Sequence, residues 1–581
     1  MAADQPSAGR PHIQRRPLPE PLPRLCADPL LNRLYAARGV QQAGALELRL
    51  SRLLPAQDLK GLDAALDRLA QALDRQEHIL IVGDFDADGA TSTTLMVLAL
   101  RDLGAQVSYL VPDRFKYGYG LTPAIVDLAL STAYTAGPPR LLVTVDNGIS
   151  GHEGVAHAHA CGLEVIITDH HLSTHAPPPA CAVVNPNQPG CAFASKALAG
   201  VGVAFYVLAA LSTRRRQQGQ PGSRLTDYLD LVALGTVADV APLDANNRIL
   251  VAQGLQRIRL GQCRPGILAL LQVAGRTASG LEASDLGFVL GPRINAAGRM
   301  EHMRTGIECL LAPTLEQALP LAERLDALNR ERRSTEARMQ RDAQALLAAR
   351  PLLEQAQPSG AIVLYEPGWH QGVIGIVAGR LKEQYHRPAV VFAAADGRAE
   401  LIKGSARSIP GVHIRDAIEA VAERHPGLVH YFGGHAAAAG LTLAAADLSL
   451  FTQALNTEMA RYPAEVFAEV LYSDGALTAA ELHANTARTL AQAGPWGQAF
   501  APPLFEGEFH LLEFRWLSDG KHLRLSLRPL DGAETLEAIW FNATPLGLQQ
   551  VLRVGLLYRL SLNTFRQQTR LQLEVVQGWV L

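Results

Sequence analysis

Four short apolar runs, separated by helical patterns, organise residues 79 to 200. They read ILIVG (79 to 83), QVSYLV (106 to 111), LLVTV (141 to 145) and LEVIIT (163 to 168). Strands that are apolar along their length, and that alternate with helices of ten or more residues, are typical of a parallel sheet covered on both faces. The pattern therefore predicts an α/β domain in this part of the chain.

The pattern changes twice further along the chain. Residues 321 to 349 combine strong helix formers with dense alternating charge and contain no glycine or proline. A helix of that length spans about 40 Å at 1.5 Å per residue, which suits a bridge between domains. A second αβ unit, with strands at 361 to 365 and 388 to 393, is predicted to follow. After Pro463, short strands joined by turns predict a small barrel of OB type.

The length of 581 residues exceeds what one hydrophobic core usually serves, so several domains are expected. We divide the chain into a flexible tail rich in proline and arginine (1–24), a first αβ domain (25–312), a connecting helix (313–350), a second αβ domain (351–462) and a C-terminal barrel (463–581).

Acidic and histidine residues gather where the predicted strands end. In parallel sheets ligands bind beyond the carboxyl ends of the strands, so these side chains are expected at one edge. An apolar helix over 228 to 243 also carries an acid near its end. The residues in question are Asp84, Asp86 and Asp88 after the first strand, Asp146 in TVDNG, Asp169, His170 and His171 in TDHH, and Asp239 in the helix.

Such a concentration of like charge calls for a cation. Two carboxylates about 6 Å apart repel by roughly 3 kcal/mol at an effective dielectric near 20. Taken singly, DADG and VDNG also fit surface turns, but their joint placement favours a metal site. Carboxylates with one or two imidazoles suit Mn²⁺ or Mg²⁺ better than zinc, and two such ions can share bridging ligands.

The overall charge of the chain limits where nucleic acid or another phosphate could bind. The net charge is −2 and the pI about 6.8, so any phosphate-binding surface must be local. Residues 380 to 415 hold seven Lys or Arg against three acids, and they form such a local basic segment.

Six scattered cysteines without metal-type spacing indicate reduced thiols of a cytoplasmic protein. No apolar run is long enough for a signal peptide or membrane span, so we expect a soluble protein.

The segment GGHAAAAG (433 to 440) has two interpretations. Its glycines permit close backbone approach, and His435 stands at the start of a predicted helix of small residues, which fits an anion site built from backbone amides. A tight contact between two helices would explain the small residues equally well.

The order of the motifs DFDADG, VDNG, TDHH, GTVADVAPL, GPRINAAGR, GSARS and GGHAAAAG resembles that of the RecJ family, single-strand-specific 5′ exonucleases of the DHH phosphoesterase superfamily, over roughly residues 25 to 581. The resemblance implies a DHH domain, a DHH-associated domain and an OB-fold domain. It implies that two divalent cations, preferably Mn²⁺ and alternatively Mg²⁺, are held by Asp86, Asp88, Asp146, His170 and Asp239.

Further roles rest on the same resemblance. Asp84 would share in or support the metal site, Asp169 would orient the neighbouring histidine, and His171 would face the phosphate. The substrate-binding residues that it implies are Gly433, Gly434 and His435 for a phosphate, Arg114, Ser405 and Arg407 for the terminal 5′ phosphate, and Arg293, Asn295 and Arg299 for the nucleic-acid backbone.

The predicted function is two-metal-dependent 5′ to 3′ degradation of single-stranded DNA to 5′ mononucleotides, in DNA repair and recombination. The resemblance further implies a monomeric cytoplasmic enzyme whose partners are a single-strand-binding protein and recombination or repair helicases. A narrow slot between the αβ domains would exclude duplex, and Lys521, Arg524 and Trp540 of the barrel would contact DNA. The alternatives are a phosphodiesterase or pyrophosphatase for small phosphoesters, and a non-catalytic DNA-binding scaffold.

Overall fold

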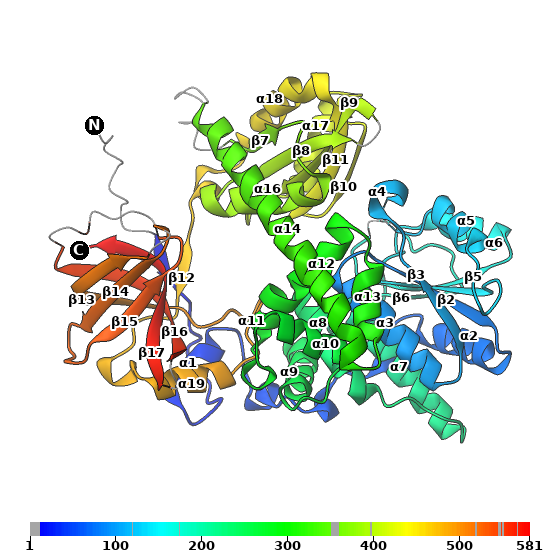
Figure 1. The fold of residues 1–581 in the computed structure, drawn as a ribbon, viewed down its shortest axis with the longest axis horizontal. Coiled ribbons are helices and arrows are strands. Elements are labelled where there is room, and N and C mark those ends of the chain that lie inside the picture. Colours follow the sequence, from blue (N-terminus) through cyan, green and yellow to red (C-terminus); the bar gives the residue numbers. More distant parts are fainter. Residues whose placement is uncertain are drawn as a thin grey trace.

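The fold is that of a computed structural model, which describes residues 12–118, 120–173, 175–349, 360–395, 398–517, 520–543, 548, 551–565 and 568–581. Two αβ domains and a β-barrel make up the molecule, with the barrel on the left and the second αβ domain at the top (Figure 1). Among the helices within these ranges, none has both the length and the apolar character needed to cross a bilayer.

The first domain is built on a parallel sheet with the strand order β3-β2-β4-β5-β6. All six residues of β2 are buried, which explains the continuous apolar run that follows His78. The strands are β2 (His78–Gly83), β3 (Gln106–Leu110), β4 (Leu141–Val145), β5 (Glu164–Thr168) and β6 (Ala182–Val184). The predicted α/β domain is confirmed.

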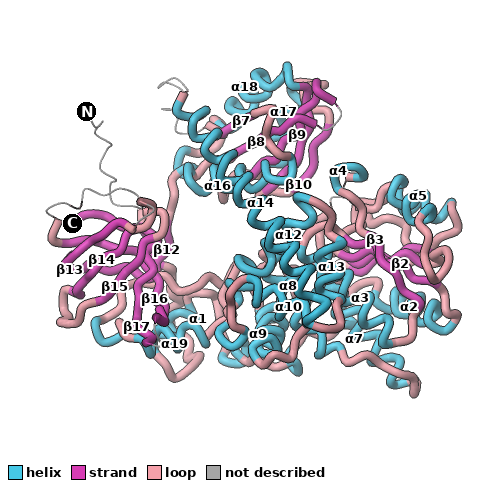
Figure 2. The backbone as a smooth tube through the Cα atoms, in the orientation of Figure 1, coloured by secondary structure: helices cyan, strands magenta, loops and turns pink. Residues whose placement is uncertain are grey.

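Helices surround this sheet and extend the domain on one side (Figure 2). They are α2 (Leu62–Asp74), α3 (Ala87–Asp102), α4 (Arg114–Tyr117), α5 (Pro123–Ser131), α6 (His152–Ala160), α7 (Gly200–Gln217), α8 (Leu229–Ala238), α9 (Ala245–Arg259), α10 (Pro265–Val273), α11 (Ala283–Asp285), a π-helix (Leu286–Leu290), α12 (Gly291–Met300) and α13 (Arg304–Leu311).

A long helix, α14 (Leu315–Ala348), joins the two αβ domains. Leu325 and Leu328 pack into the core of the first domain, whereas Met339 and Ala343 pack into the second. The prediction of a bridging helix is confirmed, although α14 begins at Leu315 and includes Pro320 in its second turn, where the ring removes one i→i−4 hydrogen bond.

The second domain contains a mixed sheet in the order β10-β11-β9-β8-β7. Its elements are β7 (Ile362–Tyr365), α16 (Gln371–Tyr385), β8 (Ala389–Ala395), β9 (Arg398–Arg407), α17 (Ile414–Arg424), β10 (Tyr431–Gly434), β11 (Ala438–Ala444) and α18 (Leu448–Met459). The prediction of a small-residue helix after His435 is wrong. Strands β10 and β11 form a hairpin there, and β11 pairs with β9, so sheet hydrogen bonds override the helical propensity of the alanines.

The C-terminal strands form a closed barrel in the order β13-β14-β15-β17-β16, as the OB-type prediction requires. They are β13 (Phe505–Trp516), β14 (Leu523–Pro529), β15 (Leu536–Trp540), β16 (Arg553–Phe565) and β17 (Gln568–Val580), preceded by β12 (Leu471–Ser473) and α19 (Ala484–Gln492).

The N-terminal segment is attached to this part of the molecule. Strand β1 (Ile13–Arg15) pairs in parallel with β12, and Leu34 of α1 (Pro29–Ala36) belongs to the core of the barrel. The prediction of a flexible tail over 1–24 is therefore wrong for Ile13–Arg15, and its residues 1–11 lie outside the described ranges. Arg38, which pairs with Asp474 at 2.9 Å, ties the same region to the barrel.

Candidate active site

The acidic loop after β2 is bent back on itself. Asp86 is the N-cap of α3, and its Oδ1 atom accepts a hydrogen bond from the Gly89 amide at 3.0 Å. Asp84 accepts one from the Phe85 amide at 2.8 Å. A side chain at Gly89 would lie 2.6 Å from the Asp84 carbonyl oxygen, so only glycine permits this turn. The bend brings together carboxylates that an extended strand would separate.

Asp88 is held by the start of another helix. Its Oδ2 and Oδ1 atoms accept hydrogen bonds from the amides of Gly200 (2.6 Å) and Val201 (2.9 Å), in the first turn of α7. A helix N-terminus carries partial positive charge, which favours a carboxylate there. Burial and the charge of Asp86 nevertheless raise the pKa of Asp88 to about 7.

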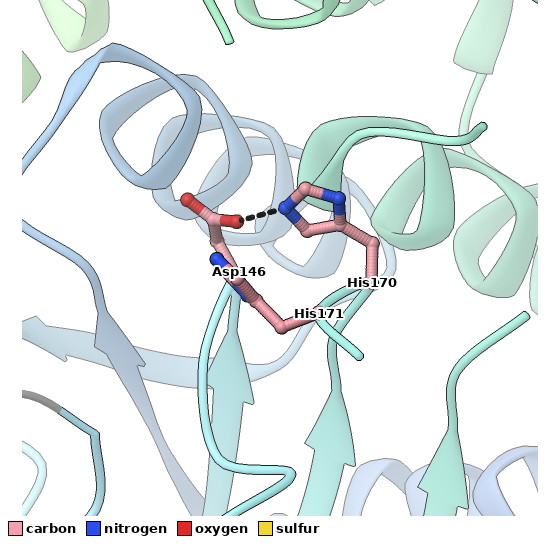
Figure 3. Close-up of side chains that lie close together, drawn as sticks. All are labelled: Asp146, His170 and His171. Carbon is pink, nitrogen blue, oxygen red and sulfur yellow. Dashed lines mark ion pairs between the residues drawn. The ribbon is translucent and has the colours of Figure 1, made fainter. Parts of the chain in front are cut away.

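Asp146 and His170 face each other at the ends of β4 and β5 (Figure 3). The Nε2 atom of His170 lies 3.0 Å from Oδ1 of Asp146, and both atoms are buried without a hydrogen-bond partner in the described structure. Burial and the neighbouring His171 lower the pKa of His170 to about 4, which leaves the ring neutral near pH 7. Such a buried pair fits a cation bound between its two atoms.

Asp239 completes the cluster from a third direction. It is the C-cap of α8, and its Oδ2 atom lies 3.9 Å from His170 Nε2, the same distance as Asp88 Oδ2. Burial and neighbouring carboxylates raise the pKa values of Asp84, Asp146 and Asp239 well above the usual range.

Three sets of ligand atoms, each within 4.8 Å of one another, emerge from these residues. They are Asp84, Asp86 and Asp146; Asp88, His170 and Asp239; and Asp146, His170 and His171. Overlapping sets of carboxylate and imidazole ligands fit two hard divalent cations, which would also offset the repulsion between the acids.

Asp169 and His171 form a separate, strongly paired unit beside the cluster. Oδ1 of Asp169 accepts from the backbone amides of His170 and His171 and lies 2.7 Å from His171 Nδ1. Burial acts to raise the pKa of Asp169, but the hydrogen bond with His171 lowers this pKa to about 2. Burial acts to lower the pKa of His171, but the same hydrogen bond raises that pKa to about 9. Asp169 therefore orients the ring of His171, but only the backbone of His170.

The second domain contributes His435 to the same place. The rings of His171 and His435 are nearly parallel, at 18°, with centroids 6.2 Å apart. His435 follows the β10 strand, and Gly434 before it has φ +139 and no room for a side chain, since a Cβ would lie 2.4 Å from the Ala438 carbonyl oxygen. The hairpin thus delivers an imidazole from one domain to the acids of the other.

Three partly buried arginines, Arg114, Arg299 and Arg407, lie next to this junction. Arg407 donates to Ser405 Oγ at 3.0 Å, and Arg114 lies over the Phe85 ring at 4.3 Å. Burial, with the charges of Arg114 and Arg407, lowers the pKa of Arg299 to about 10. Like charges gathered in this way favour an anion such as a phosphate. The sequence did not indicate that Arg299 belongs to this group.

Other predicted substrate contacts have structural partners. Arg293 forms an ion pair with Asp326 of α14 at 2.9 Å, and Asn295 Oδ1 accepts from the Ala87 amide at 2.8 Å. Asn295 thereby supports the acidic loop, a role that no local sequence pattern indicates. In the basic segment, Arg380 is paired with Glu336 and Glu383, and Arg415 with Glu419.

The barrel residues differ in their exposure. Trp540 is only 3% exposed and belongs to the barrel core, so the prediction that it stacks on DNA is wrong. Arg524 is half-exposed and paired with Glu537 at 2.6 Å, while Lys521 is exposed.

The sequence matches three domain families, described as the DHH family, N-terminal domain (residues 78–236), the DHHA1 domain (359–461) and the RecJ OB domain (473–577). It is 49% identical to the single-stranded-DNA-specific exonuclease RecJ of Dickeya dadantii, over 98% of this chain and 99% of that protein. The chain belongs to the RecJ family.

Other RecJ proteins agree with this membership. Identity to the single-stranded-DNA-specific exonuclease RecJ of Escherichia coli is 49%, over 97% of both chains. The crystal structure of Thermus thermophilus RecJ in complex with Mn²⁺ aligns with a TM-score of 0.80 at 31% identity, covering 98% of this chain and 79% of that one. A second structure of that RecJ, in complex with Mg²⁺, aligns with a TM-score of 0.74 at 30% identity, over 98% of this chain and 78% of that one.

Proposed function

We propose that the chain is a metal-dependent 5′ to 3′ exonuclease that degrades single-stranded DNA to 5′ mononucleotides in DNA repair and recombination. The observation that carries the proposal is the buried Asp146–His170 pair at the centre of a cluster of acids, whose Oδ1 and Nε2 atoms have no hydrogen-bond partner among the residues that the structure describes. The names of the relatives, single-stranded-DNA-specific exonucleases, support the substrate.

Five residues are our proposed ligands for two divalent cations, with Mn²⁺ preferred, and Asp84 shares in the site. Bound there, the ions would supply the Lewis acidity that polarises a phosphodiester and activates water. The chain itself supplies their geometry, since α7 orients Asp88 and the turn at Gly89 places Asp86. The five ligands are Asp86, Asp88, Asp146, His170 and Asp239.

We assign the two facing imidazoles to the scissile phosphate. His171, whose pKa is raised to about 9, is positively charged near pH 7 and can stabilise the charge that develops on the phosphate oxygens. His435 reaches the same region from the second domain and can donate a further hydrogen bond, and the backbone at Gly433 and Gly434 gives the close approach that this needs.

The arginine group is our proposed pocket for the terminal 5′ phosphate. It consists of Arg114, Arg299 and Arg407 together with Ser405, and its position beside the acids would put the first phosphodiester of a bound strand at the metal centre. Arg293 is instead assigned to the attachment of α14, and Asn295 to the support of the metal loop.

The domain division supports action on a strand. We propose a DHH domain to residue 312, the helix 313–350, a DHH-associated domain over 351–462 and the OB domain from 463, which also includes β1 and α1. Because α14 joins separate cores, it can hold the two αβ domains apart around a slot for one strand. We further propose that the protein acts as a monomer in the cytoplasm, with a single-strand-binding protein and repair helicases.

One experiment separates this function from its alternatives. The protein is incubated with Mn²⁺ and, in parallel, with 5′-phosphorylated single-stranded DNA, blunt duplex, a dinucleotide and pyrophosphate. The proposal requires mononucleotides from the single strand and slower or no release from the duplex. Consumption of only the dinucleotide or pyrophosphate would indicate a small-phosphoester hydrolase, and binding of DNA without any hydrolysis would indicate a scaffold.

A further inference from the structure

An exposed aromatic residue lies in the segment that packs on the end of α8, the helix that Asp239 caps. Phe288 is 78% exposed, although the residues at both ends of its segment, Leu286 and Leu290, are fully buried. These residues form the π-helix Leu286–Leu290, an uncommon element that often occurs at functional sites. The π-helix is therefore anchored in the core while it presents one large apolar ring to solvent.

The π-helix packs on the last turn of α8, which ends at the proposed ligand Asp239. A side chain built on Gly287 would lie 3.3 Å from Val237 Cγ1, and one on Gly291 would lie 3.1 Å from Ala238 Cβ. The ring of Phe288 thus belongs to a segment in contact with the two residues that precede Asp239.

A second exposed apolar side chain follows Asp239 directly. Val240 is 63% exposed and has φ +58, a conformation that is unfavourable for a β-branched residue. Such strain is retained mainly at sites of function. The Val240 amide donates to the Val237 carbonyl at 3.1 Å, so Val240 and the π-helix contact the same turn.

The residues that precede the π-helix lie on the barrel side of the first domain. α11 immediately precedes the π-helix and lies on the side of the first domain that faces the barrel (Figure 1). The pKa of Glu282 is raised by burial, by Asp285 and by the charge of Glu574 in β17. Because the charge of Glu574 reaches Glu282, this residue, which precedes α11, lies near the barrel. The π-helix that carries Phe288 therefore follows directly on the part of the first domain that faces the barrel.

We propose that Phe288 and Val240 form a platform on which a nucleobase of the single-stranded substrate stacks, next to the nucleotide being cleaved. Every base has a π-face, so an aromatic platform holds a strand without selecting its sequence. A paired base would first have to give up its own pairing and stacking, at a cost of about a few kcal/mol, which would add to the selection of single strands. The inference rests on the proposed function, because it names a substrate contact of the same site.

The test measures binding of 5′-phosphorylated oligo(dT) in EDTA, where no hydrolysis occurs, by fluorescence anisotropy. The full-length protein is compared with Phe288→Ala, Phe288→Tyr and the control Leu260→Ala, which removes another exposed apolar side chain (63% exposed) at the end of α9. A matched series of oligonucleotides carries one abasic nucleotide at successive positions from the 5′ end.

We expect Phe288→Ala to weaken binding about fivefold to a hundredfold, while Phe288→Tyr and Leu260→Ala bind like the unmodified protein. At one position, removal of the base should weaken binding to the unmodified protein but not weaken binding to Phe288→Ala further. Unchanged binding by Phe288→Ala, or an additive loss at every position, would overturn the platform. Failure of the unmodified protein to hydrolyse single-stranded DNA with Mn²⁺ would instead overturn the proposed function, whatever the anisotropy shows.

Discussion

The ring of His171 in the first domain lies nearly parallel to the ring of His435 in the second, with their centroids 6.2 Å apart. Each ring is held within its own domain, His171 by Asp169 and His435 by the turn in which its amide donates to the Ala438 carbonyl at 2.7 Å. The two sides of the site therefore meet only when α14 sets the domains in this relation.

Replacement of His435 by alanine tests the contribution of the second domain. We expect kcat on single-stranded DNA to fall about a hundredfold, the usual effect of losing one donor to a charged transition state. The affinity for Mn²⁺, measured by calorimetry, should not change, because His435 is outside the ligand sets. The control His430→Ala, an exposed histidine just before the same strand, should leave both quantities intact. A parallel loss of Mn²⁺ affinity in His435→Ala would contradict this role.

His170→Ala and Asp88→Ala test the metal centre. Each should lower Mn²⁺ affinity at least a hundredfold and abolish hydrolysis, because the bound cation loses one of its ligands. Binding of single-stranded DNA, measured by anisotropy, should persist. His159→Ala, an exposed position on α6, serves as the control. Hydrolysis at the normal rate in either variant would remove that residue from the mechanism.

Gly200→Ala tests the support that α7 gives to the ligands. A Cβ at this position would lie 2.7 Å from Asp146 Oδ1, and the Gly200 amide already holds Asp88. We expect Mn²⁺ affinity to fall about tenfold to a hundredfold, as happens when the groups that orient ligands are disturbed. Gly379→Ala, at a helical glycine with open space around it, should bind Mn²⁺ normally. Equal affinities in the two variants would show that Gly200 is not needed.

The pH dependence follows from the raised pKa of Asp88. Burial and Asp86 raise it from 3.8 to about 7 when no metal is bound, so between these values the folded chain binds more protons than the unfolded one. The free energy of unfolding in EDTA should therefore fall as pH rises from about 4 to 7. Mn²⁺ must displace the proton, so its affinity should rise over about pH 6 to 8. Thermal unfolding and calorimetry across this range give both slopes. Asp88→Asn should make the first slope less steep, while Asp84, Asp146 and Asp239, whose pKa values are also raised, keep the remainder. A Mn²⁺ affinity that is independent of pH would refute the assignment.

Arg407→Ala tests the 5′-phosphate pocket. Loss of a charged hydrogen-bonding group should reduce the preference for a 5′-phosphorylated over a 5′-hydroxyl end about tenfold to a hundredfold in kcat/KM. Arg424→Ala, which removes a surface arginine paired with Glu458, is the control. If the preference persists in Arg407→Ala, the terminal phosphate is bound elsewhere.

Local patterns were sufficient for much of this protein. The apolar strands, the acids at their ends, the bridging helix and the barrel all follow from periodicities and turn residues within short windows, because burial on both faces of a sheet demands continuous apolar runs. The convergence of Asp88, Asp146 and His170 was predictable for the related reason that parallel strands end at one edge, whereas Asp239 reaches them from the end of helix α8.

Residues whose partners lie far along the chain could not be placed in this way. The alanines after His435 favour a helix locally, and only pairing with β9 makes them a strand. Trp540, Arg293 and Asn295 have side chains that suit DNA contacts, yet the barrel core, Asp326 and the Ala87 amide occupy them.

The sequence by itself determined most of the elements and the ligand chemistry of this protein, because both depend largely on residues within a strand, a turn or a helix. The tertiary structure decided which of the charged residues share a site, because burial and hydrogen bonding between distant segments are set only when the domains pack. The facing rings of His171 and His435 and the grouping of Arg299 with Arg407 belong to this second kind.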